Sequence, residues 1–305
     1  MIPVRELRDL VLERRQEVDG SRHIAAASSL ARLEDTLFVV ADDEMVLGVF
    51  PLNASKPGYA LQILEGKLPR DHSDRQEQKP DLESVTLLAP FGELSHGALL
   101  ALGSGSGAKR HRGALIPLLA DRRPAEAHVE VDLTSLYEAL AAAVGELNIE
   151  GAAALETVLR LLQRGDGERA RNARVDLDLG EVCAALAHGE PLPPSAILDV
   201  VDYDLGRLHG VELSFSDASP LADGRMVFAA SAEDPGSETD GAIEGSALGI
   251  LDVEGRVEML EPVDLPIKVE GMTARLADDG VETLMVTDAD DPKEPSRLWS
   301  ATLDA

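Results

Sequence analysis

The sequence predicts an all-β protein with a five-bladed β-propeller fold, and a short repeated pattern is the main reason. In each copy, apolar residues lead to a Ser or Glu followed mostly by small residues, and the copies recur at intervals of 54 to 67 residues. Repeats of this length that consist of short strands are typical of propeller blades. We expect a single domain over residues 1–305, with six blades as the alternative. The marked positions, one per copy, are Ser28, Glu83, Glu150, Ser216 and Glu270.

Each copy continues with the same succession of apolar and polar segments. In the first copy, SSLARL predicts an inner strand, TLFVVA a second strand and VLGVFPL a third. In the fourth copy, Asp-Gly at 223–224 indicates the corresponding hairpin. Fourth, outer strands are expected at 59–66, 127–133, 197–203 and 257–263.

The last copy has no room for a fourth strand of its own, because the chain stops soon after RLWSATL at 297–303. We therefore expect residues 7–14 to lie beside 297–303 and to close the ring, which removes an exposed sheet edge. Two short alanine-rich segments, 135–144 and 180–188, predict helical insertions in the third blade. The second of them contains Cys183, which we expect to be a buried core thiol.

The composition limits the classes of partner and the cellular compartment that we expect for this protein. The net charge of −28 argues against nucleic acid and anionic membrane surfaces as partners, because like charges repel. No apolar run reaches the roughly 18–20 residues that a membrane-spanning helix requires. The first fifteen residues are charged where a secretory signal would be apolar, and a lone cysteine forbids an internal disulfide. A cytoplasmic location is expected. We interpret the acidity as that of a surface adapted to high salt, where salt screens the repulsion between carboxylates.

The marked glutamates predict a metal site. On equivalent points of the innermost strands, Glu83, Glu150 and Glu270 would enter one narrow channel, together with Ser28 and Ser216. Carboxylates about 5 Å apart repel by roughly 3 kcal/mol per pair at an effective dielectric of about 20. A hard cation with oxygen ligands relieves that repulsion, and Ca²⁺ suits mixed ligands best, with Mg²⁺ and Na⁺ as alternatives. The alternative without an ion is that the glutamates bond to backbone amides or share protons.

The carboxyl-terminal half carries a resemblance to a known family. The segments 208–237, 246–263 and 267–276 resemble the last blades of calcium-activated nucleotidases, the soluble apyrases. This resemblance implies five blades, phosphoanhydride hydrolysis and a central calcium. Its ligands would be the five marked residues, with Ser214 as the alternative to Ser216. The Glu-Gly phrases at Glu150 and Glu270 are also similar to those of esterase-like phytase propellers.

The polar loops that follow the second strands supply candidates for substrate chemistry. These loops should lie on one face near the channel mouth. Asp42, Asp43 and Asp288 are candidates to position a water molecule beside a metal that polarises the substrate. Cations gather in the second and third loops and predict a site for a small anionic molecule. The predicted ligand-binding residues are Lys109, Arg110, Arg112, Arg164 and Arg174.

Three functions fit these observations. The first is a metal-dependent hydrolase of phosphoanhydride or phosphoester substrates, which the apyrase resemblance and the cationic loops favour. The second is a non-enzymatic propeller that binds a ligand or a protein around a structural ion. The third is a lactone or ester hydrolase, which needs no basic phosphate site.

Overall fold

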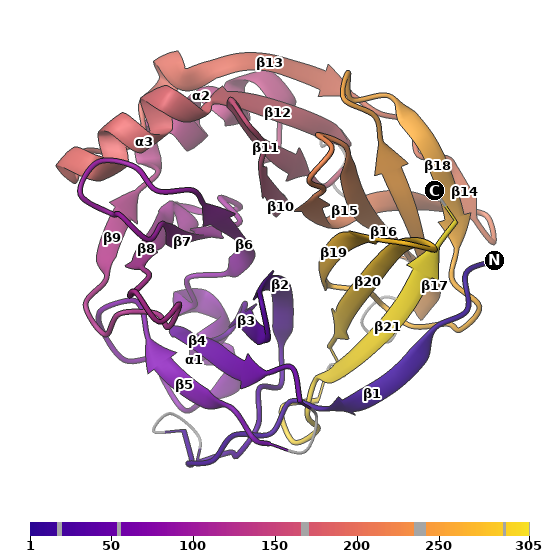
Figure 1. The fold of residues 1–305 in the computed structure, drawn as a ribbon, viewed down its shortest axis with the longest axis horizontal. Helices are drawn as coiled ribbons and strands as arrows, with labels where there is room; N and C mark the ends of the chain where they lie inside the picture. The colour runs from indigo at the N-terminus through magenta and orange to yellow at the C-terminus, as the bar shows by residue number, and fades with distance from the viewer. Residues whose placement is uncertain (17–19, 54–55, 166–170, 235–241, 289–290, 305) are drawn as a thin grey trace.

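The computed structural model is a ring of five antiparallel β-sheets, which confirms the predicted five-bladed propeller (Figure 1). It describes residues 1–16, 20–53, 56–165, 171–234, 242–288 and 291–304. In each blade the first strand of the repeat lies nearest the axis, and the following strands succeed one another outward. The innermost strands are β2 (Ala27–Leu33), β6 (Leu82–Leu88), β10 (Ile149–Ala154), β15 (Val211–Pro220) and β19 (Gly271–Ala277).

The outer strands follow the predicted order. The second strands are β3 (Thr36–Ala41), β7 (Ala98–Gly103), β11 (Val158–Gln163), β16 (Met226–Asp234) and β20 (Gly280–Thr287). The third strands are β4 (Val46–Pro51), β8 (Arg112–Pro117), β12 (Ala173–Asp178), β17 (Ala242–Leu251) and β21 (Arg297–Leu303). The fourth strands are β5 (Tyr59–Gln62), β9 (Val129–Asp132), β13 (Ile197–Asp202) and β18 (Val257–Pro262), and a two-residue β14 (Arg207–Leu208) pairs with β15.

An amino-terminal strand closes the ring, as predicted, but it is shorter and earlier than 7–14. Strand β1 (Arg5–Asp9) pairs antiparallel with β21 and forms the outer edge of the fifth blade. After Asp9 the chain turns toward the first blade, where Leu12 forms a bridge with Gly58. Leu10 and Leu12 are buried there, because their side chains fill the core between the fifth and first blades.

In the described residues three α-helices lie among the blades, and two of them were predicted. Helix α2 (Thr134–Val144) and helix α3 (Leu179–His188) pack into one apolar cluster between the second and third blades. Helix α1 (His72–Gln78), which precedes β6, was not predicted. Cys183 is half-buried rather than fully buried, because it lines a pocket together with Phe91 and Leu179. Among the described residues, no helix has the length and apolar character needed to span a membrane.

Five apolar clusters hold the ring together, one between each pair of neighbouring blades. Between the third and fourth blades, for example, Phe215 and Phe228 meet edge to face with their ring centroids 5.3 Å apart. Because neighbouring blades cover the faces of each sheet, the inner strands of most blades are buried along most of their length. The outermost strands, such as β5 and β9, are largely exposed.

A β-bulge occurs at the marked position of the inner strands. In β6 the pairing passes from Leu82 to Ser84, so Glu83 is the extra residue. The same skip leaves Ser28, Glu150 and Ser216 as extra residues in β2, β10 and β15. Just before β19, the amide of Glu270 donates to the Val286 carbonyl, 3.0 Å away, although Val286 already faces Gly271. A bulge re-aims the side chain that it carries, and these bulges make the five marked positions structurally equivalent.

A buried carboxyl group ties three blades together below these bulges. Asp217, in β15 of the fourth blade, is 0% exposed. Its Oδ2 accepts a hydrogen bond from the Met272 amide of the fifth blade at 2.7 Å and another from Ser29 Oγ of the first blade at 3.1 Å. Its Oδ1 accepts the Ala218 amide at 2.7 Å. Burial raises the pKa of Asp217, and these hydrogen bonds oppose that increase.

We predict that Asp217→Asn lowers the free energy of unfolding by about 1–3 kcal/mol, because an amide has only one acceptor oxygen and leaves a buried donor without a partner. Urea unfolding followed by circular dichroism measures the change. Asp279→Asn, at an exposed turn, is the matched control and should leave stability within about 0.5 kcal/mol of the parent. Equal stability of the two variants would contradict a central tie at Asp217.

Candidate metal centre at the channel mouth

Three sets of equivalent positions form the mouth of the channel. The first set is the marked bulge residues. The second lies two residues earlier, on the same side of each inner strand, because side chains alternate along a strand. The third set follows the part of each second strand that is aligned with the inner strand: four of its residues come directly after the second strand, and Glu233 lies in β16 just after the pairing with β15 ends. The second set is Ala26, Asp81, Asn148, Ser214 and Lys268, and the third is Asp42, Ser104, Arg164, Glu233 and Asp288.

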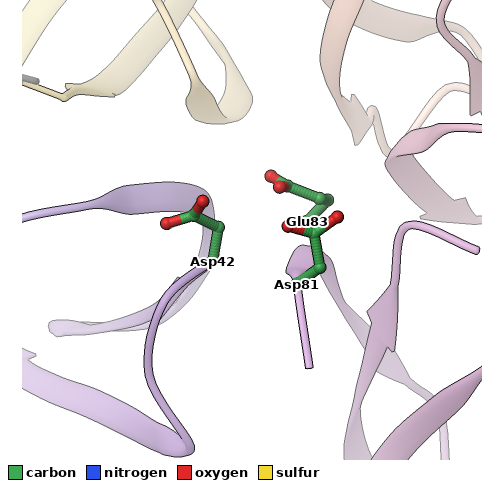
Figure 2. Close-up of side chains that lie close together, drawn as sticks. All are labelled: Asp42, Asp81 and Glu83. Atoms are coloured by element: carbon green, nitrogen blue, oxygen red, sulfur yellow. The ribbon is translucent and has the colours of Figure 1, made fainter. Parts of the chain in front are cut away.

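One residue from each set forms an acidic trio. Carboxylate oxygens of Asp42, Asp81 and Glu83 lie within 4.8 Å of one another. Figure 2 shows the side chains of Asp81 and Glu83 beside each other, across from Asp42. The trio therefore joins the end of β3 in the first blade to the start of β6 in the second.

Backbone contacts fix this junction. The Asp81 amide donates to the Asp42 carbonyl at 3.1 Å, and the Ser104 amide donates to the Asp81 carbonyl at 2.8 Å. Asp81 has a φ of 55°, in the left-handed region that aspartate tolerates better than most residues. Its Oδ2 also accepts a hydrogen bond from Ser104 Oγ at 2.5 Å. The two acids from neighbouring blades are thus held together by the main chain.

The trio carries more negative charge than its basic neighbours offset. Lys79 Nζ contacts Asp42 and lies 2.8 Å from Asp81 Oδ1, while Arg110 Nη1 lies 3.0 Å from Asp81 Oδ2. Burial raises the pKa of Asp42 to about 6, although Lys79 opposes the increase. The pKa of Glu83 is raised by its loss of hydration and then by Glu150 and Asp81. Two carboxyl groups of the trio are therefore poised to bind either a proton or a cation.

The other marked glutamates lie in a chain of ion pairs instead. Arg164 links Glu150, whose Oε1 is 3.7 Å from its Nη1, to Glu233, whose Oε1 is 2.8 Å from its Nη2. Lys268 Nζ lies 2.6 Å from both Glu233 and Glu270. Burial alone would raise the pKa of Glu233, but Arg164 and Lys268 outweigh it and hold that pKa below its usual range. On this side of the ring, each of the three carboxylates therefore has an ion pair with one of two built-in cations.

The serines of the predicted ring have different surroundings. Ser28 Oγ donates to the carbonyl of Leu82 at 2.5 Å and is turned toward the second blade. Ser216 is 0% exposed, and its Oγ has no hydrogen-bond partner within the described residues. Ser214 Oγ donates to the Gly165 carbonyl at 3.3 Å. Of the two alternatives in the fourth blade, only Ser216 keeps a buried, unused hydroxyl.

A pocket of about 530 Å³ opens beside the trio, between the second and third blades. Asp81, Glu83 and Glu150 form its inner wall, and Arg110 and Glu146 lie at its rim. Asn148 Nδ2 donates to Glu150 Oε1 at 2.6 Å, which orients this carboxylate at the pocket wall. The lining is predominantly acidic. The pocket therefore attracts cations, and it repels an anion that does not bring a cation with it.

The five cationic residues predicted to bind a ligand do not converge. Arg110 and Arg164 reach the mouth, where both are paired with carboxylates. Arg112 pairs with Glu130 on the outermost strand β9, and Arg174 pairs with Asp176 and Asp199. Lys109 is exposed and donates to the Glu77 carbonyl of α1 at 3.1 Å. Arg112 and Arg174 therefore lie on the outer part of their blades, away from the channel.

The three candidate catalytic aspartates also separate. Asp42 belongs to the trio. Asp43 points away from it and forms a buried ion pair with Arg75 of α1, with 3.1 Å between Oδ2 and Nη1. Asp288 is half-buried at the end of β20, in the fifth blade.

Sequence reasoning missed Lys79, Asp81 and Lys268, which decide the charge of the site. A signal for two of them was present. Asp81 and Lys268 lie two residues before a marked glutamate, and strand alternation places such a residue on the same side. Lys79 had no such signal, because it lies in the segment that joins α1 to β6.

Comparisons with known proteins place the chain in a family and in a fold. A family model described as "Family of unknown function (DUF6929)" matches residues 23–303. No match is found among curated proteins. The α-L-arabinofuranosidase PaAbf62A from Podospora anserina, solved with cellotriose, is similar in structure with a TM-score of 0.56 and 12% identity, over 99% of this chain and 97% of that one. The α-L-arabinanase from Penicillium chrysogenum, solved with arabinobiose, gives 0.47 and 8% over 98% of each. The TM-score to PaAbf62A shows a shared fold.

We predict that Lys268→Met lowers the free energy of unfolding by about 1–3 kcal/mol at pH 7, because it leaves Glu233 and Glu270 side by side without their shared cation. An acid whose pKa is lowered by folding stabilises the protein above its ordinary pKa and loses that contribution as the pH falls. The deficit should therefore shrink as the pH falls below about 5. Urea unfolding between pH 4 and pH 8 measures it.

Lys293→Met, at an exposed position outside the site, is the control and should show no deficit at any pH in that range. A deficit in Lys268→Met that is the same at pH 4 and pH 8 would indicate lost packing rather than lost ion pairs.

Proposed function

Because the protein belongs to a family whose function is unknown, DUF6929, we propose a function from the site itself: a hydrolase that depends on a cation held by Asp42, Asp81 and Glu83. The observation that carries this proposal is the acidic trio, with its oxygens within 4.8 Å of one another and an adjoining pocket. The propeller fold that it shares with a sugar hydrolase agrees with the proposal but does not carry it.

The residues of the trio fit a hard cation. Every donor atom is a carboxylate oxygen, and the hydroxyl of Ser104 lies beside Asp81. Ca²⁺ accepts six to eight such ligands in irregular geometry, which suits this site better than the strict octahedron of Mg²⁺, and Na⁺ is the weaker alternative. Lys79 holds the two aspartates together when no ion is bound.

This position differs from the five-residue ring implied by the apyrase resemblance. Glu150 and Glu270 already have Arg164 and Lys268 beside them, so an ion on the axis would compete with built-in cations. Glu83 has no ion pair among the described residues and belongs to both ligand sets. We therefore assign the ion to the second-blade side of the mouth, with Glu83 as its central ligand.

The pocket favours an uncharged substrate rich in oxygen, such as an ester or a lactone. A bound Ca²⁺ would offset part of the excess negative charge and polarise a substrate oxygen. Glu150 lies outside the trio but on the same pocket wall, where Asn148 orients it. We assign it to accept the proton of the attacking water. Arg110, at the rim, can donate hydrogen bonds to an oxygen of the substrate.

Two other functions each have an observation in their favour. A phosphoester or phosphoanhydride substrate agrees with the apyrase-like segments and with Arg110 at the pocket, although Arg112 and Arg174 lie too far out to assist. A non-enzymatic binding propeller agrees with Lys79, Arg164 and Lys268, which neutralise much of the mouth without an ion. The experiments below separate the three.

We predict that Ca²⁺ raises the thermal stability of the protein and that Glu83→Gln abolishes this response. At a hundredfold excess over the dissociation constant, one site contributes about 2.7 kcal/mol. Without the ion, Glu83→Gln should match or exceed the parent in stability, because it removes a carboxylate whose charge is disfavoured by burial. Differential scanning calorimetry with CaCl₂ and with EDTA measures both effects.

Glu156→Gln, an exposed glutamate elsewhere on the third blade, should keep the full calcium response. A parent protein that shows no shift with Ca²⁺, Mg²⁺ or Na⁺ would overturn the cation site.

We predict calcium-dependent hydrolysis of an aryl ester or a sugar lactone, with Glu150→Gln lowering kcat by about 10²–10⁴-fold, the usual range for loss of a general base. Its calcium-induced thermal shift should persist, whereas Glu83→Gln should lose both activity and shift. A nucleoside diphosphate is assayed in parallel by phosphate release. Turnover of the diphosphate alone would favour the apyrase-like function, and a calcium response without turnover of either class would favour the binding propeller.

A further inference from the structure

A second cleft lies between the fifth and first blades, at the opposite end of the inner strands from the acidic trio. Its volume is about 700 Å³. The fifth blade contributes two cross-strand rows to its wall, because Thr273, Leu284, Ser300 and Arg5 face one another in register, as do Arg275, Glu282 and Thr302. The first blade contributes Arg32 and Leu52.

Three arginines line this cleft, and two have no carboxylate partner within the described residues. Arg275 is paired with Glu282, whose Oε2 lies 2.6 Å from its Nε and 2.5 Å from its Nη2. Arg32 donates only its Nε, to the Glu34 carbonyl at 2.8 Å. Within the described residues, the side chain of Arg5 forms no hydrogen bond or ion pair. Burial lowers the pKa of Arg32 and the neighbouring charge of Arg275 lowers it further, while the carboxylates of Glu282 and Asp35 oppose the decrease.

The charged side chains that line this cleft are mostly positive, whereas the protein as a whole carries a negative net charge. Its three arginines face two carboxylates, Glu282 and Asp304, in a protein with a net charge of −28. An anion is therefore repelled by most of the surface and attracted here. The remaining wall is mixed: Leu7, Leu52 and Leu284 are its largest apolar side chains, and Thr273, Thr283, Ser300 and Thr302 also line it.

From this combination we propose that the cleft binds a small monocarboxylate with a short apolar body. The carboxylate accepts hydrogen bonds from the free terminal nitrogens of Arg32 and from Arg5, because a guanidinium presents paired donors that match two carboxylate oxygens. The apolar body packs against the three leucines. This site does not depend on the hydrolase proposal, since it shares no residue with the trio or its pocket.

Isothermal titration calorimetry with hexanoate tests the site. We expect saturable binding with one site per chain, at least tenfold weaker in Arg32→Gln and weakened also in Arg5→Gln. Arg5 is exposed on an edge strand, so its variant should fold even if Arg32→Gln does not. Arg297→Gln is the matched control, because Arg297 lies on neighbouring β21 outside the cleft, and it should bind as the parent does.

Two further ligands separate the parts of the proposal. Hexanol should bind much more weakly than hexanoate, and inorganic phosphate should not compete at equal concentration. No saturable binding of hexanoate, or equal affinity in Arg32→Gln, Arg5→Gln and the parent, would overturn the site. Equal affinity for hexanol would overturn the role of the arginines, and stronger binding of phosphate would overturn the carboxylate class.

Discussion

Crowding at the propeller axis governs the architecture of this protein. Five inner strands approach so closely that two of them carry glycine where they meet a neighbour. A Cβ on Gly271 would lie 2.6 Å from Cα of Ser29, and one on Gly151 would lie 2.9 Å from backbone atoms of Asp217 and Ala218. Large side chains cannot point inward at this level. Asp217 fits at this level because the Met272 amide and the Ser29 hydroxyl, from two other blades, donate hydrogen bonds to its carboxylate in place of water.

The same crowding creates the functional mouth. The bulge directly above this level turns one side chain per blade out of the packed centre, so polar groups from five blades collect in a ring. An acidic chain that gathers carboxylates in this way must also bring cations to them. On one side Arg164 and Lys268 pair with all three carboxylates. On the other, Lys79 and Arg110 pair with Asp42 and Asp81, and among the described residues Glu83 has no ion pair. This asymmetry is the reason for placing the proposed cation site beside Glu83 rather than on the axis of the ring.

The repeat, the blade count and the closing strand were predictable from the sequence, because they follow from periodicity and from a missing fourth strand. The equivalence of the marked positions was predictable too, whereas their partners were not. Arg174 illustrates the limit. It was treated as a loop residue, but it lies inside β12, two residues from Asp176 and on the same face, so strand alternation pairs the two. Lys79 depends on where a short, unpredicted helix ends, which local pattern did not reveal.

Closure by β1 makes the ring depend on contacts between segments that are far apart in the sequence. The register pairs Arg5 with Ser300, so the contact that seals the ring joins segments separated by nearly the whole described chain. Contacts of such long range carry a large entropic cost and slow folding. During synthesis β1 emerges long before β21, the strand with which it pairs. It therefore stays unpaired while the first four blades form. The ring therefore gains its full stability only at the last step, when its two ends meet.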